Sequence, residues 1–89
     1  MLKLGMNTSG TLADSPKAAK FERGEIIVQM HSGVEVRFNP AINPRLAKGT
    51  PLQLGNIEMS PYGLHWPDLD EDLSFRGLLE GNFGQRRKV

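Results

Sequence analysis

The segment from residue 64 to residue 81 concentrates the side chains of this chain that are best suited to chemistry. It contains His65, the single tryptophan Trp66, and four acids among the five positions from 68 to 72. Histidine exchanges protons near neutral pH, and carboxylates act as acid–base groups or as ligands for hard cations. The segment therefore raises four hypotheses: an active site, a metal loop, a docking surface, or a turn that leads into a helix.

The metal hypothesis depends on the alternating acids at 68, 70 and 72. Their spacing matches the first ligands of an EF-hand calcium loop, which then requires glycine and glutamate at the positions of Leu73 and Leu79. Acids also gather where a helix begins, because the helix dipole and its free N–H groups attract negative charge. We therefore expect no metal site and no cofactor, and we interpret the acids as the start of a helix.

The enzyme hypothesis depends on His65 as a general base. Such a base needs a nucleophile or a second acid–base group, both aimed into a pocket. A small sheet with two short helices offers little concavity. A cross-strand pairing of His65 with Glu58, which the register below predicts, is a sufficient structural role. We therefore expect no catalytic residues, and a histidine-based or metal-assisted enzyme is the third hypothesis for function.

Composition narrows the class of protein. The chain has 89 residues, enough for one domain, and it has no cysteine, which excludes disulfides and thiolate metal sites. Eleven basic and ten acidic residues nearly balance, so no long-range field draws the chain to nucleic acid. The first residues contain no apolar run long enough for a signal peptide or a membrane span. We expect a cytoplasmic protein that does not interact with membranes.

Apolar and polar residues alternate between residues 17 and 38, which is typical of strands with one buried face. Gly24 and Gly33 mark the turns between three such strands. Folding the chain at these turns places every apolar partner on the same face, as one buried side requires. The predicted pairs are Phe21 with Ile26, Ala19 with Val28, Ile26 with Phe38, Val28 with Val36, and Met30 with Val34.

The second half alternates short helices with a hairpin. Residues 43–49 predict one or two helical turns, with Asn as cap, Pro at the first position and Gly after the end. A turn at residues 60–63 predicts a hairpin. The last helix has Phe75, Leu78 and Leu79 facing inward, Asp70 or Ser74 as its cap, and Gly81 as its stop. The expected pairs of the hairpin are Met59 with Leu64, Ile57 with Trp66, and Glu58 with His65, and Trp66 is expected on the inward face.

The expected fold is therefore α+β. An antiparallel three-strand meander is followed by a short helix, a second β-hairpin and a C-terminal short helix. The expected organisation is a flexible leader over residues 1–15, a single domain over 16–83, and a flexible basic tail over 84–89. The meander has open edges, so a homodimer through strand pairing is a further expectation.

Two stretches carry a resemblance to a known family. The segments PRLAKGTP (44–51) and SPYGLHWPDLDEDLSFRGLLEG (60–81) resemble small bacterial and phage proteins of the domain of unknown function 2442 family. The resemblance implies an α+β module with no established activity. In some members it implies a helix-turn-helix extension, and in others a partner gene in a toxin–antitoxin-like arrangement. This chain ends soon after its last helix, so direct DNA regulation is not expected, and its residues 50–60 suggest a shorter first helix.

The family motif covers fourteen positions of this chain. Its glycines and leucines have ready structural explanations, whereas His65 with Asp70 and Asp72 leaves a surface role open. The positions are Pro44, Arg45, Gly63, His65, Trp66, Pro67, Leu69, Asp70, Glu71, Asp72, Gly77, Leu78, Leu79 and Gly81.

Two non-enzymatic functions follow. The first is an interaction module that binds another small protein, such as the toxin-like product of a neighbouring gene, and the chain would then be the antitoxin-like member of the pair. The second is nucleic-acid binding through Arg45, Lys48 and the tail residues Arg86, Arg87 and Lys88. The candidate partner-binding residues of the first hypothesis are Tyr62, His65, Asp68, Asp70, Glu71 and Asp72.

Overall fold

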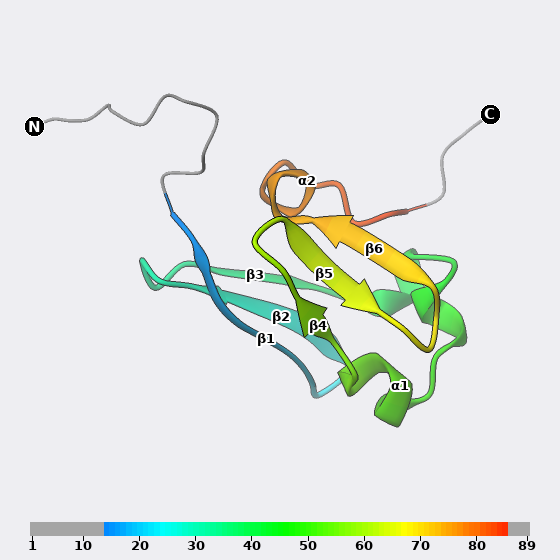
Figure 1. Ribbon diagram of the computed structural model, residues 1–89. Helices are drawn as coiled ribbons and strands as arrows, with labels where there is room; N and C mark the ends of the chain where they lie inside the picture. Colours follow the sequence, from blue (N-terminus) through cyan, green and yellow to red (C-terminus); the bar gives the residue numbers. More distant parts are fainter. Residues whose placement is uncertain (1–13, 86–89) are drawn as a thin grey trace, which may run out of the picture.

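Two antiparallel three-stranded sheets lie over one another in the computed structural model, which describes residues 14–85 (Figure 1). Short helical segments connect the two sheets and follow the last strand. The first sheet contains β1 (Pro16–Glu22), β2 (Glu25–Met30) and β3 (Glu35–Phe38), and the second contains β4 (Glu58–Met59), β5 (Gly63–Trp66) and β6 (Glu71–Ser74). The connecting segments are η2 (Pro40–Ile42), η3 (Leu46–Lys48) and α1 (Pro51–Gly55), and α2 (Phe75–Leu79) follows β6.

The first sheet confirms the predicted meander. Its first turn has positive φ at both Arg23 and Gly24, as a two-residue hairpin turn requires. Of the expected leader, residues 1–13 lie outside the described residues, as do residues 86–89 of the expected tail. Ser15, the last residue of the expected leader, lies within the described residues, and its backbone oxygen accepts a hydrogen bond from His31 N at 2.8 Å. Four predicted pairs are in the ladder, Ala19–Val28, Phe21–Ile26, Ile26–Phe38 and Val28–Val36, and Met30 N donates to Val34 O at 2.9 Å.

The core fills the space between the two sheets. Trp66 faces this core, as predicted, with none of its surface exposed, and its Nε1 donates to Leu54 O at 3.0 Å. The inward residues of β2 and β3 meet those of β5 and β6, and the helical segments close the sides. The buried members are Ile26, Val28, Met30, Phe38, Leu46, Leu54, Leu64, Trp66, Leu73, Phe75 and Leu78.

The predicted helix over residues 43–49 is only the short 3₁₀ turn η3, which follows Arg45 as its N-cap, and the side chain of Asn43 binds the backbone at its start. Asn43 Oδ1 accepts from the backbone N–H groups of Arg45 and Leu46 at 2.9 and 3.1 Å. The helix α1 that follows was not predicted. Its signal is Thr50 three residues before Gln53, and both hydrogen bonds of this capping box form, at 3.2 and 3.0 Å.

The acids of residues 68–72 do not begin a helix, so that interpretation is wrong. Residues 67–70 turn the chain, and Glu71–Ser74 form β6, a third strand that pairs with β5. Helix α2 begins only at Phe75, and its cap is Ser74, whose Oγ accepts from Gly77 N at 2.9 Å. Pairing with β5 decides the conformation of β6, because a four-residue segment with one apolar side chain carries no periodic signal.

Two further details differ from expectation. Ile57 does not pair with Trp66, because β4 covers only residues 58–59 and Ile57 N donates to Gly55 O at 3.1 Å. Leu79 is 44% exposed, since α2 has only five residues and directs Phe75 and Leu78 to the core. Gly81 has φ of +87°, which confirms the left-handed stop. Between residues 14 and 85, no helix is long and apolar enough to span a membrane.

Candidate functional site on the second sheet

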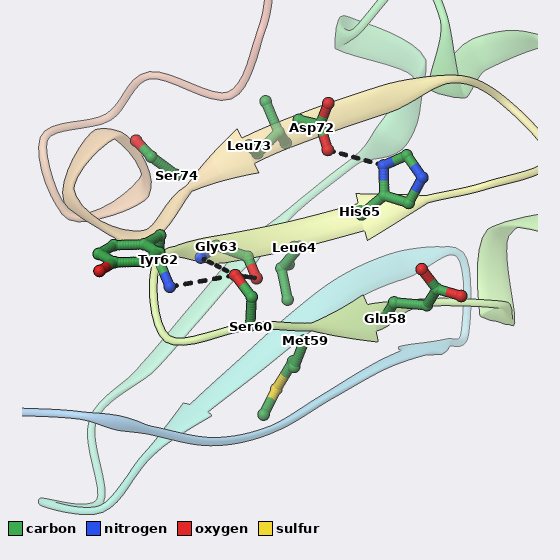
Figure 2. Close-up of a pocket in the computed structure, with 10 residues that line it drawn as sticks. All are labelled: Glu58, Met59, Ser60, Tyr62, Gly63, Leu64, His65, Asp72, Leu73 and Ser74. Carbon is green, nitrogen blue, oxygen red and sulfur yellow. Dashed lines mark hydrogen bonds and ion pairs between the residues drawn. The ribbon is translucent and has the colours of Figure 1, made fainter.

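A row of three polar residues crosses the outer face of the second sheet (Figure 2). The predicted pair of Glu58 with His65 forms, and on its other side His65 pairs with Asp72. Paired residues point to the same side of a sheet, and alternate residues point to opposite sides. Because Leu64 and Leu73 face the core, Glu58, His65 and Asp72 face outward.

The side chain of His65 contacts Asp72 and not Glu58, which corrects the expected interaction. Its Nδ1 lies 2.6 Å from Asp72 Oδ1. The turn hydrogen bond from Ser60 N to Gly63 O, at 3.0 Å, sets the alternation of the ladder. Glu58 and His65 are then a hydrogen-bonded pair, while His65 and Asp72 are a non-hydrogen-bonded pair, in which the side chains lie closer.

The contact with Asp72 determines which ring nitrogen of His65 carries the proton. A carboxylate only accepts, so Nδ1 carries a proton and donates to Asp72. The His65 side chain is 38% exposed and that of Asp72 is 78% exposed. This geometry is the base-and-orienting-acid half of a nucleophilic triad. The adjacent hydroxyls serve the backbone instead, since Ser60 Oγ accepts from Tyr62 N and Gly63 N and Ser74 Oγ caps α2.

A depression of about 340 Å³ is bordered by this row and by the β4–β5 turn. Tyr62 stands at the turn with 82% of its surface exposed. Gly63 separates Tyr62 from the row and contributes no side chain there (Figure 2). A Cβ at position 63 would collide with the carbonyl oxygen of Leu73, so this glycine lets β6 approach β5 closely. The lining residues include Glu58 and Asp72 and no lysine or arginine.

The four predicted acids do not form one patch, because each has a different partner. Asp68 accepts from Asn56 Nδ2 at 3.0 Å. Asp70 has positive φ in the β5–β6 turn, and Arg45 Nη1 donates to its backbone oxygen at 2.7 Å and lies 3.3 Å from its Oδ2. These two acids therefore hold the turn between β5 and β6.

Glu71 points inward, in register with Trp66. Its Oε2 accepts from Nδ2 of Asn43 at 2.7 Å, and the same amide group donates to Phe83 O at 2.9 Å. Asn43 has no exposed surface, and the four hydrogen bonds of its side chain connect the start of η3, β6 and the segment after α2. Of the six candidate residues, the structure therefore brings together Tyr62, His65 and Asp72.

Glu58 joins these three residues, although it was not among the six candidates. The signal for Glu58 was available, since the predicted hairpin register places it opposite His65. We define the His65 face as Glu58, Tyr62, His65 and Asp72. Within residues 14–85, Glu58 makes no ion pair, and no group of three or more histidine or acidic side chains is arranged to hold a metal ion.

The outer face of the first sheet carries more charges, but they pair with one another. Lys20 Nζ lies 3.0 Å from Glu22 Oε1. Arg37 Nη1 lies 3.2 Å from Glu25 Oε1, and its Nη2 lies 2.9 Å from Glu35 Oε1. The hydrogen bond and charge of Lys20 lower the pKa of Glu22. Hydrogen bonds from Gln29 and then Arg37 lower the pKa of Glu35. This face therefore has few charges left for a ligand.

Two stacked three-stranded sheets with short helices define a small α+β protein, and its relatives share the fold. The chain belongs to the family described as protein of unknown function (DUF2442), which matches residues 16–84. This finding confirms the resemblance seen in the sequence. No curated protein matches the chain.

Two solved structures are similar to this protein. One is a crystal structure of a protein of unknown function from Rhodospirillum rubrum, with 33% identity and a TM-score of 0.73, covering 84% of this chain and 95% of that one. The other is the solution structure of the uncharacterized protein CV0863 from Chromobacterium violaceum, with 31% identity and a TM-score of 0.69, covering 80% of this chain and 69% of that one.

Proposed function

We propose that this protein is a small non-enzymatic interaction module that binds another protein through the His65 face. One observation carries the proposal: this face presents two carboxylates and an exposed tyrosine beside a depression whose lining has no lysine or arginine. Exposed tyrosines are enriched at protein interfaces, and complementary charge provides specificity. The surrounding acids are held in their own contacts, so they position this face without covering it.

The alternatives have less support. Arg45, a residue of the nucleic-acid hypothesis, is held by Asp70 at the β5–β6 turn. A histidine-based enzyme would need a nucleophile, and the hydroxyls of Ser60 and Ser74 both accept backbone N–H groups. We further propose that the partner is the product of a neighbouring bacterial gene, with this chain as the antitoxin-like member of a cytoplasmic pair.

Site-specific photocrosslinking tests the proposal. A photoreactive phenylalanine analogue replaces Tyr62 on the His65 face or, as the matched control, Lys20 on the first sheet, and the chain is co-expressed with the product of the adjacent gene. The proposal expects an adduct with that product from position 62 and none from position 20. Adducts from position 20 alone, from both positions alike, or from neither would contradict it.

A further inference from the structure

We propose that the His65 face receives the guanidinium group of an arginine in a basic segment of the partner. This inference rests on the proposed function, and it specifies the chemistry that the partner must bring. A surface that receives an arginine side chain differs from an enzyme pocket, from a sheet edge that pairs with an added strand, and from an interface between two copies of this chain.

The charge of the surface favours a cation. Glu58 on β4 and Asp72 on β6 lie on either side of His65, and no lysine or arginine borders the depression. Asp72 uses Oδ1 for His65, which leaves Oδ2 to accept from a ligand. A cation placed above His65 would be attracted by both carboxylates, and its charge would compensate theirs.

The size of the depression favours one side chain. Its volume of about 340 Å³ is at the lower end of the range of about 300–1,000 Å³ that is usual for small-molecule sites. Tyr62 directly precedes β5 and lies three residues before His65, so a rise of about 3.3 Å per residue separates them by at most roughly 10 Å. A partner backbone beside Tyr62 therefore places a long side chain over Gly63, with its head group near His65. The aromatic ring of Tyr62 covers the apolar stem.

The spacing of the carboxylates favours arginine over lysine. Glu58 and Asp72 are two strands apart, a backbone separation of roughly 10 Å at about 4.8 Å per strand. A guanidinium group is planar and directs five N–H donors outward in a wide fork, so it can address acceptors on both sides. A lysine ammonium group is a compact and strongly hydrated point charge, which makes it a poorer bridge between them.

The edges of the second sheet are poorly suited to adding a strand. Strand β4 has only two residues, and Asp72 N of β6 already donates to Glu71 Oε1 at 3.2 Å. A second copy of this chain is also a poor occupant. A two-fold interface through this face would bring the carboxylates of Glu58 and Asp72 of both copies together, and like charges that lie close to each other repel. Side-chain recognition by a basic partner is the mode that the surface supports.

Amide chemical shifts of the isotope-labelled full chain test this inference. The probes are three capped peptides of sequence Gly-Arg-Gly, Gly-Lys-Gly and Gly-citrulline-Gly, where citrulline keeps the shape of arginine without its charge. We expect saturable shifts at Gly63, His65 and Asp72 with the arginine peptide. Lysine should bind about threefold or more weakly than arginine, and citrulline at least about tenfold more weakly.

Matched variants locate the binding. The double variant Glu58→Gln with Asp72→Asn should weaken the arginine peptide by at least about tenfold, while Glu22→Gln with Glu25→Gln on the first sheet should leave its affinity unchanged. Unchanged shifts of Trp66 and Leu64 show that each variant is folded. The single variant Tyr62→Ala keeps both carboxylates, and we expect it to weaken binding by a smaller factor.

Three outcomes overturn the inference: equal binding of the arginine and citrulline peptides, equal binding after neutralisation of Glu58 and Asp72, or shifts confined to the first sheet. The result is separable from that of the proposed function. Crosslinking from position 62 without an arginine preference would keep the interaction module and discard the arginine. Arginine binding without a crosslinked partner would do the reverse.

Discussion

Each three-stranded sheet carries a row of three paired residues across the middle of its outer face. In the first sheet the row is Lys20, Ile27 and Arg37, and in the second it is Glu58, His65 and Asp72. Ile27 is only 3% exposed, although it faces away from the core. Two long basic side chains flank it, and side chains of this kind can lay their aliphatic stems along an apolar neighbour. His65 has short acidic neighbours and is 38% exposed at its side chain.

The two rows also differ in how their charges are paired. Lys20 and Arg37, the cross-strand neighbours of Ile27, pair with glutamates of the same face. On the second sheet, Asp72 contacts His65 and Glu58 has no cationic partner among the described residues. The comparison shows how one architecture yields both a surface closed by its own ion pairs and a surface that still has charge to compensate.

The largest expected difference between the two rows is the contribution of their central residues to the free energy of unfolding. We expect Ile27→Ala to lower the free energy of unfolding by about 2–4 kcal/mol, because it leaves a cavity beneath the charged pairs. His65→Ala should cost less than about 1 kcal/mol, since it removes a half-exposed contact. Urea denaturation followed by Trp66 fluorescence measures both values. Equal losses would show that the two central residues have the same structural role.

The close approach of β5 and β6 should make the next largest contribution to the free energy of unfolding. Gly63→Ala places a methyl group against the carbonyl oxygen of Leu73, so we expect a loss of about 1–3 kcal/mol. Gly55→Ala is the matched control, because nothing lies within 4 Å of its Cβ position and its φ is not positive. The same denaturation experiment compares them. Equal stability of the two variants would contradict the tight packing at Gly63.

Removing the His65–Asp72 contact should affect binding far more than stability. Asp72→Asn keeps the shape of the side chain and should change the free energy of unfolding by less than about 1 kcal/mol. Its effect should appear instead as a weaker crosslink from position 62. The matched control Glu22→Gln, on the first sheet, should leave that crosslink unchanged. Strong destabilisation by Asp72→Asn would indicate that the contact is structural.

The smallest expected effect is a change in the pKa of Glu22 on the first sheet. Because Lys20 lowers the pKa of Glu22, Lys20→Gln should raise that pKa toward its ordinary value. A carboxyl group with a lowered pKa stabilises the folded state above its unfolded pKa, and this contribution is lost as pH falls through the folded pKa. Carbon-detected titration of the side chains measures the shift. Glu35, whose pKa is lowered chiefly by Gln29 and Arg37, should move less.

The sequence predicted the first sheet well because its information is local. Alternating apolar residues and the turn at Arg23–Gly24 determine the pairing of β1 with β2, and one buried face excludes a shift by one residue. The same reasoning placed Glu58 opposite His65 and Trp66 in the core. Helix α1 was equally local, since the capping box at Thr50 and Gln53 is readable in the sequence.

The candidate site depended on contacts between distant residues. Strand β6 forms because β5 is there to pair with it, and this pairing gives His65 a second neighbour whose side chain lies closer than that of Glu58. Asp70 accepts a hydrogen bond from Arg45, 25 residues away in the chain, and Glu71 accepts one from Asn43, 28 residues away. No periodicity encodes such partners.

By itself, the sequence determined the α+β class, the register of the first sheet and the residues of the family motif, because period and turn chemistry operate over neighbouring positions. Only the tertiary structure decided which acids remain available. It assigned Asp68, Asp70 and Glu71 to contacts that hold the turn and the core, and it left Asp72 beside His65. The physical reason is that a carboxylate's role depends on the donor that packing brings within hydrogen-bond distance.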